Sequence, residues 1–279
     1  MIVLSSLTVM PLLEALQNGF GAATFTPDLG VSLVEVALSE AGIQFQSGEQ
    51  ILWSVIEEIA EEEHACFLLE NSTTQLIRRY STAFDRYYSL YPTESAPTML
   101  ISGIPMHRIK GTNPYLDTLS KIKAVAPIGG NVLDTSTGLG YTAIEAAKTA
   151  TQVTTIELDP TALEIARLNP WSQGLFNDSK IQQVIGDSFE EIERFSEGSF
   201  SVIIHDPPMF SLAGDLYSIT FYQQAFRVLK RNGRLFHYIG DPESKSGGRM
   251  TAGVIRRLKE AGFRQVTHKP QAFGVVAYK

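Results

Sequence analysis

Cysteine and histidine are scarce in this chain of 279 residues, which holds one cysteine, Cys66, and five histidines. A single thiol cannot form an intramolecular disulfide, and the scattered histidines provide no C-x-x-C or H-x₃-H zinc pattern. We therefore expect no metal site. A reducing cytoplasm is the predicted compartment.

The chain also lacks a long uninterrupted hydrophobic run at its start. The first fifteen residues are apolar, but Pro11 and Glu14 interrupt them, and no basic segment of the kind that opens a signal peptide precedes them. We expect a soluble N-terminal helix and no membrane partner. With 44% apolar and 19% charged residues and no internal repeat, the chain can bury a large core, which excludes a mainly disordered protein.

Basic residues are absent from positions 1–77, which contain eleven acidic ones, and the net charge of the whole chain is −7. The stretch from Arg227 to Lys269, by contrast, contains eleven basic residues and three acidic ones. Both stretches can be ordinary solvated faces, or the acidic segment can pack against the basic one or recruit a cationic substrate. The overall acidity argues against tight, nonspecific DNA binding.

A change of pattern near residue 100 divides the sequence. Alternating segments such as residues 31–38, an acidic helical run over 53–63 and an apolar run over 66–70 predict a small α+β domain at residues 1–105. An aromatic cluster predicts a helix leading into a linker, and a short hairpin is expected over residues 98–104. The cluster comprises Tyr80, Phe84, Tyr87, Tyr88 and Tyr91.

From about Leu116 onward, short β-branched runs alternate with helical stretches, which is typical of a parallel sheet with crossover helices. Helices are expected to start near Gly140, Thr161, Ser188, Tyr217 and Arg249. We predict an α/β domain at residues 106–279 with a seven-stranded, doubly wound, mostly parallel sheet whose last strand is antiparallel. Its strands are residues 131–134, 152–157, 181–185, 200–205, 234–239, 263–268 and 273–278.

The strand ending at Asp134 leads through a turn of small residues into a helix. The turn carries Ser136, Gly138 and Gly140, and its glycines let the backbone approach a ligand beside the N–H groups of the helix N-terminus. The spacing Gly138-x-Gly140-x-x-Ala143 also fits the dinucleotide fingerprint. Because the acidic residue precedes the first glycine by four positions, the motif resembles that of class I S-adenosylmethionine-dependent methyltransferases, with Ser136 in place of their first glycine.

Two further acidic residues lie at the carboxyl ends of the next two predicted strands. Glu157 lies where a carboxylate can accept both ribose hydroxyls, a geometry that nicotinamide enzymes share. The resemblance implies that Asp187, which Ser188 follows, accepts a hydrogen bond from the adenine amino group. We expect the acids that close three successive strands to line one crevice and bind S-adenosylmethionine, although each could instead cap the helix that follows it.

The fourth strand of this domain ends in Asp206-Pro207-Pro208-Met209-Phe210. A carboxylate and carbonyl oxygens held by a stiff exit suit an amino group, whose N–H bonds would aim the nitrogen lone pair at a methyl carbon. The motif resembles the tetrad of amino-directed methyltransferases, from which it departs by Met209 at the aromatic position. We therefore predict catalytic roles for Asp206, Pro207 and Pro208.

Three other functions remain open. Aminopropyltransferases of the spermidine synthase type have a similar core, a small N-terminal β-domain and an acidic polyamine pocket, although only Asp206 and Asp215 approach their aspartate pair. A nicotinamide oxidoreductase and a non-catalytic binding module are the others. The methyl acceptor is also open, and can be a small amine, a protein side chain or a nucleic-acid base. The sequence does not determine the oligomeric state, and it is compatible with a homodimer.

Overall fold

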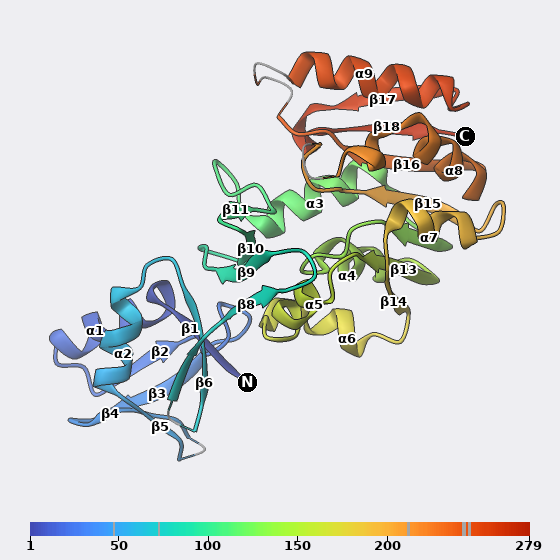
Figure 1. The fold of residues 1–279 in the computed structure, drawn as a ribbon. Coiled ribbons are helices and arrows are strands. Elements are labelled where there is room, and N and C mark those ends of the chain that lie inside the picture. The colour runs from blue at the N-terminus through green and yellow to red at the C-terminus, as the bar shows by residue number, and fades with distance from the viewer. Residues whose placement is uncertain (47, 72, 211–212, 242–243, 245–246) are drawn as a thin grey trace. The chain divides into compact units, whose positions relative to one another are not determined.

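The computed structural model describes residues 1–46, 48–71, 73–210, 213–241, 244 and 247–279 (Figure 1). The chain forms two compact units. The first comprises Met1–Tyr115 with Thr161–Gln173, and the second comprises Leu116–Pro160 and Gly174–Lys279. The boundary predicted after residue 105 stays a prediction.

The first unit contains helices and small antiparallel sheets, as an α+β domain should. The expected N-terminal helix is α1 (Ser6–Gln17), and the acidic run forms α2 (Trp53–Glu61). One sheet has the order β1-β6-β7 and another β2-β3-β4-β5. Their strands are β1 (Ile2–Ser5), β2 (Ala22–Phe25), β3 (Val34–Leu38), β4 (Gly42–Gln44), β5 (Gln50–Leu52), β6 (Cys66–Glu70) and β7 (Thr73–Leu76).

The helix predicted at the aromatic cluster is wrong, because these residues form a hairpin of β8 (Arg78–Ser81) and β9 (Arg86–Tyr91). Aromatic side chains favour strands, where they pack against side chains of the neighbouring strand. The ring centroids of Tyr80 and Tyr87 are 4.8 Å apart. The hairpin expected at residues 98–104 is confirmed as β10 (Thr98–Ile101) and β11 (Ile104–Pro105).

The second unit is built on one seven-stranded sheet of order β14-β13-β12-β15-β16-β18-β17. The fold class predicted from the sequence is confirmed: the first five strands run parallel, and the last strand, β18, is antiparallel to both neighbours. The strands are β12 (Asn131–Asp134), β13 (Gln152–Glu157), β14 (Ile181–Ile185), β15 (Phe200–His205), β16 (Leu229–Tyr238), β17 (Gln265–Lys269) and β18 (Gly274–Tyr278).

The helices start within two residues of their predicted positions. The start of α8 falls at Ile219 rather than Tyr217, because the Ser218 hydroxyl caps it by accepting the N–H of Phe221 at 3.1 Å. The helices of the chain from residue 114 on are α3 (Pro114–Val125), α4 (Tyr141–Ala147), α5 (Pro160–Arg167), α6 (Gln173–Asn177), α7 (Ser188–Arg194), α8 (Ile219–Val228) and α9 (Gly247–Glu260), with short 3₁₀ turns at Pro170–Ser172, Gly214–Tyr217 and Pro270–Ala272.

The inner residues of β12 and β15 are apolar and buried, as expected where helices cover both faces of a doubly wound sheet. Leu133, Ile203 and Leu235, on three neighbouring strands, are fully buried in the main core cluster of this unit. Burial of such side chains fixes the strand register. The carboxyl ends of β12, β13, β14 and β15 therefore meet at one edge of the sheet, where a ligand crevice is expected.

Candidate cofactor and acceptor site

The turn after β12 is held in place by its two neighbouring strands. The Thr135 N–H donates to the Ile204 carbonyl of β15 at 3.1 Å, and the Thr137 N–H donates to the Ile156 carbonyl of β13 at 2.9 Å. These bonds extend the sheet pairing one to three residues beyond Asp134. The turn therefore presents its remaining backbone groups from a fixed position.

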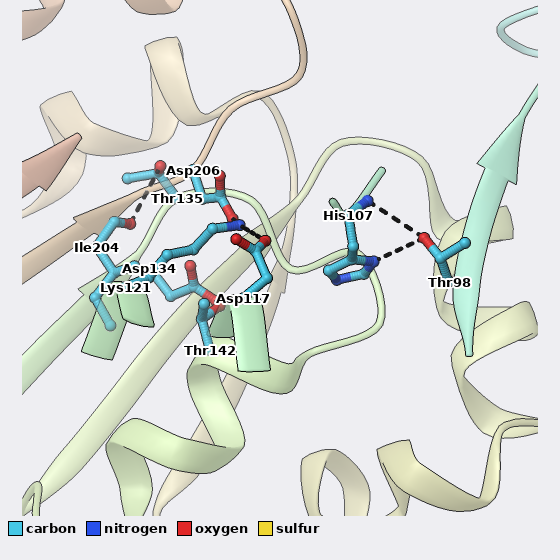
Figure 2. A network of polar contacts seen from close by, with 9 residues as sticks. All are labelled: Thr98, His107, Asp117, Lys121, Asp134, Thr135, Thr142, Ile204 and Asp206. Atoms are coloured by element: carbon cyan, nitrogen blue, oxygen red, sulfur yellow. Dashed lines mark hydrogen bonds and ion pairs between the residues drawn. The ribbon is translucent and has the colours of Figure 1, made fainter. Parts of the chain in front are cut away.

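Asp134 ends β12 and is fully buried. Its Oδ2 accepts a hydrogen bond from the Thr155 hydroxyl at 2.9 Å. It accepts another from the Thr142 hydroxyl at 3.2 Å, and Figure 2 draws Asp134 with Thr142. Burial raises the pKa of Asp134 to about 7, against the lowering effect of these hydrogen bonds. Its Oδ1 has no hydrogen-bond partner among the described residues. A buried acceptor left without a donor is costly, so this oxygen is suited to a ligand donor.

Glu157 ends β13 and fixes the glycine turn through its carboxylate. Its Oε2 accepts the N–H of Gly138 at 2.8 Å, and its Oε1 accepts the N–H of Asp159 at 3.1 Å. Burial raises the pKa of Glu157 to about 7. Each carboxylate oxygen has a second lone pair, so both oxygens remain able to accept a hydroxyl while holding the backbone.

Both glycines of the turn have positive φ, +52° at Gly138 and +77° at Gly140, which residues with a Cβ rarely adopt. Gly140 is also the N-cap of α4, and a Cβ built there would lie 2.7 Å from the Leu175 side chain. The half-buried Ser136 lies in the chain between Asp134 and these glycines. The turn is thus locally shaped for close approach of a ligand to the backbone.

The two residues after the β14 exit have different roles. Asp187 is exposed and caps α7, since its carboxylate accepts the N–H of Phe189 at 2.8 Å. Ser188 is buried and donates its hydroxyl to the Thr135 carbonyl at 2.6 Å, which joins the exits of β14 and β12. β14 lies next to β13, with Ile185 paired to Glu157. The three predicted acids are therefore found at the carboxyl ends of adjacent strands. The adenine-binding role of Asp187 stays a prediction.

The exit of β15 carries the predicted acceptor residues. The Asp206 side chain is 18% exposed, Pro207 is buried, and Pro208 is half-buried. The Pro208 carbonyl accepts the Tyr217 hydroxyl at 3.0 Å, so one of the carbonyls predicted to suit an amino group has a partner within the protein. The next residues, Met209 and Phe210, are both about half exposed and add an apolar surface.

A lysine that the sequence interpretation missed lies against Asp206. The Lys121 side chain, on α3, is 2% exposed, and its Nζ lies 2.6 Å from Asp206 Oδ2 and 2.8 Å from Asp117 Oδ2 (Figure 2). Burial alone would lower the pKa of Lys121, but the two carboxylates outweigh it and the net pKa is raised, so the ammonium stays charged. The i,i+4 spacing of Asp117 and Lys121 was the available sequence signal.

Two histidines, His205 of β15 and His237 of β16, are buried and hydrogen-bonded. In His205, Nδ1 lies 2.7 Å from the Thr135 hydroxyl and Nε2 lies 2.9 Å from the Leu216 carbonyl. Since that carbonyl needs a donor, Nε2 carries the proton. Burial lowers the pKa of His205 to about 3 and holds that of His237, bonded to the Tyr222 hydroxyl at 2.8 Å, well below its ordinary value. This geometry favours structural roles for both.

The model of the methyltransferase small domain family matches residues 109–242, the segment that carries all of these site residues. The resemblance to class I S-adenosylmethionine-dependent methyltransferases is therefore confirmed. The chain carries an enzyme domain of this class, whose cofactor is S-adenosylmethionine.

Among full-length proteins, the "Uncharacterized protein MJ1233" of Methanocaldococcus jannaschii is 45% identical over 238 residues, covering 85% of this chain and 81% of that protein. The chain belongs to the family of this archaeal protein. A polyamine aminopropyltransferase of Sulfolobus acidocaldarius is 31% identical over 143 residues, which cover 49% of this chain and only 46% of the relative.

Solved structures share the fold. A spermidine synthase in complex with the transition-state analogue AdoDATO superposes with a TM-score of 0.60 at 19% identity, covering 76% of this chain and 78% of that one. At this identity the likeness shows the fold alone. In the part of the chain that the structure describes, no helix is long and apolar enough to cross a membrane.

Proposed function

We propose that the second unit binds S-adenosylmethionine at the carboxyl ends of β12, β13 and β14 and transfers its methyl group to an amino nitrogen beside Asp206. The observation that carries this proposal is the buried Asp134 carboxylate, whose Oδ1 has no hydrogen-bond partner in the described part of the chain, next to the glycine turn that Glu157 holds. Glu157 would accept the ribose hydroxyls, and Asp134, Ser136, Gly138 and Gly140 would contact the cofactor. Asp187 and Ser188 would close its adenine end.

When bound, S-adenosylmethionine supplies an electrophilic methyl group on a sulfonium. The residues of the chain mainly have to align the nucleophile and exclude water, and such positioning can lower the barrier by roughly 7–11 kcal/mol in favourable cases. Asp206 would accept an N–H of the nucleophile. Pro207 and Pro208 would stiffen the exit of β15. The hydrogen bond from the Tyr217 hydroxyl to the Pro208 carbonyl would hold the same segment in place.

Aminopropyl transfer is the second candidate, and the similarity to the Sulfolobus acidocaldarius polyamine aminopropyltransferase favours it. The two reactions leave different products, S-adenosylhomocysteine after methyl transfer and methylthioadenosine after aminopropyl transfer. Incubation with decarboxylated S-adenosylmethionine and putrescine, analysed for methylthioadenosine, separates them. We keep the cytoplasm as the proposed compartment.

Calorimetry with S-adenosylhomocysteine tests the cofactor site. We expect binding by the wild type, and a loss of about tenfold or more in Glu157→Ala, because one residue both shapes the turn and accepts ribose hydroxyls. Glu190→Ala, an exposed glutamate on α7, is the matched control and should bind like the wild type. Absence of binding by the wild type, or equal binding by Glu157→Ala and the wild type, would refute the proposal.

A further inference from the structure

Asp206 shares an ammonium group with a second carboxylate. The Lys121 Nζ lies 2.6 Å from Asp206 and 2.8 Å from Asp117, and 4.7 Å from the centre of the Tyr238 ring. The side chains of Lys121 and Asp117 are 2% and 0% exposed, whereas that of Asp206 is 18% exposed. Of these three charged groups, Asp206 is therefore the one that a ligand can reach.

A buried ammonium of this kind has the chemistry of a protonated amine ligand. It donates a charge-assisted hydrogen bond to Asp206, forms an ion pair with Asp117 and lies over an aromatic ring, which are the contacts that a protein offers to an organic cation. Any second ammonium brought to the accessible Asp206 would meet a carboxylate whose Oδ2 already accepts from Lys121, with a like charge close behind it. Asp206 is thereby left as a hydrogen-bond acceptor for an uncharged N–H.

We propose that Lys121 is a specificity-determining residue that supplies the cation for Asp206 from within the protein, so that the acceptor end discriminates against small polyamines. This inference rests on the proposed function for its placement at the acceptor end. It assigns the acceptor to the class of uncharged amino or amide nitrogens, such as those of a nucleobase or a peptide. The proposal thus favours methyl transfer over aminopropyl transfer to a polyamine.

The net charge of the cluster alone does not decide the matter, since one lysine and two aspartates sum to −1. The double variant Lys121→Met/Asp117→Asn keeps this net charge and places all of it on Asp206. It also removes the buried carboxylate that Lys121→Met alone would leave without its cation. Any gain in cation binding by the double variant therefore reports the loss of local compensation rather than a change in total charge.

The experiment is calorimetric titration of putrescine into each protein saturated with S-adenosylhomocysteine. We expect putrescine to bind the double variant at least about tenfold more tightly than the wild type, since the Asp206 oxygen that accepts from Lys121 becomes available for a charge-assisted bond to putrescine. Adding Asp206→Asn to the double variant should remove the gain. Lys148→Met, which removes a lysine paired with Glu145 at 2.7 Å and 58% exposed, should leave putrescine binding as in the wild type.

Several results would overturn the inference. These are a wild type that binds putrescine as tightly as the double variant, a gain that persists with Asp206→Asn, and no gain in a double variant that still binds S-adenosylhomocysteine. If the double variant does not fold, Lys121→Gln, which keeps a donor but no charge, should show the gain and overturns the proposal if it does not. Failure of S-adenosylhomocysteine binding by the wild type would instead count against the proposed function itself.

Discussion

The carboxylates at the ends of β12 and β13 are held differently from the carboxylate after β15. Asp134 and Glu157 accept hydrogen bonds from hydroxyl and backbone N–H groups, which are neutral, and burial raises the pKa of each to about 7. Asp206 is instead bonded to the buried ammonium of Lys121. One end of the same sheet edge thus has carboxylates with neutral donors, and the other has a carboxylate with its own cation.

This difference in hydrogen-bond donors indicates how one edge of the sheet can bind two ligands of different charge. Neutral donors orient a carboxylate without cancelling its charge, so Asp134 and Glu157 stay suited to a cationic cofactor with donor hydroxyls. An ion pair orients Asp206 just as firmly but compensates its charge. The following predictions test this contrast, starting with the largest expected effect.

Replacing Lys121 should have the largest effect on stability. We expect Lys121→Met to lower the free energy of unfolding by about 3–5 kcal/mol, because it removes the buried ammonium that Asp117 and Asp206 share. Urea denaturation measures the loss. Adding Asp117→Asn should restore part of it, whereas Arg256→Ala, which breaks an exposed pair with Glu260, should cost less than about 1 kcal/mol. Equal losses in Lys121→Met and Arg256→Ala would contradict the contrast.

The raised pKa of Asp134 predicts a pH dependence. The unfolded chain releases this proton near pH 3.8 and the folded chain near pH 7, so between these values the folded state binds more protons and stability falls as pH rises. The full effect, above about pH 7, is on the order of 2–4 kcal/mol. Urea denaturation at pH 5 and pH 8 should therefore show a smaller decrease in Asp134→Asn than in the wild type.

The control for this pH dependence is Asp215→Asn, which removes an exposed carboxyl of the same unit. Its decrease in stability between the two pH values should equal that of the wild type. A wild-type decrease that is unchanged in Asp134→Asn would show that the burial of Asp134 does not control the pH dependence.

The smallest of the three effects concerns the glycine turn. Gly140→Ala should lower stability by about 1–3 kcal/mol, because it combines a left-handed φ with a Cβ that would lie 2.7 Å from the Leu175 side chain. Gly19→Ala has a similar φ of +73° but no atom within 4 Å of the added Cβ. Its smaller loss isolates the backbone contribution, and denaturant unfolding of both variants gives the comparison. Equal losses would show that the Leu175 contact is unimportant.

Local patterns predicted the second unit better than the first. The strands of the second unit are short β-branched runs between helical stretches, so burial and turn residues agree on their positions. Residues 78–91 lack such agreement, because the spacing of the tyrosines also fits a helix face. Cross-strand contacts such as that of Tyr80 with Tyr87 stabilise a hairpin instead of a helix. Such contacts form only once the two segments meet.

The neighbours Asn232 and Gly233 show the same limit at the level of single residues. Both lie within β16, and Asn232, rather than Gly233, adopts a positive φ, of 62°. Asparagine can adopt this conformation as glycine does. The residue types alone therefore do not predict which of the two neighbours has the positive φ. Part of the loop predicted over residues 240–249, namely 242–243 and 245–246, lies outside the described residues.

By itself, the sequence determined the seven strands, their alternation with helices, and the acids and glycines at the strand ends, because hydrophobic periodicity and turn chemistry are local properties. Only the tertiary structure decided which charges meet. Lys121 and Asp206 are 85 residues apart, and they come together because α3 lies against the carboxyl end of β15. An ion pair depends on that distance in space, which no local pattern in the chain encodes.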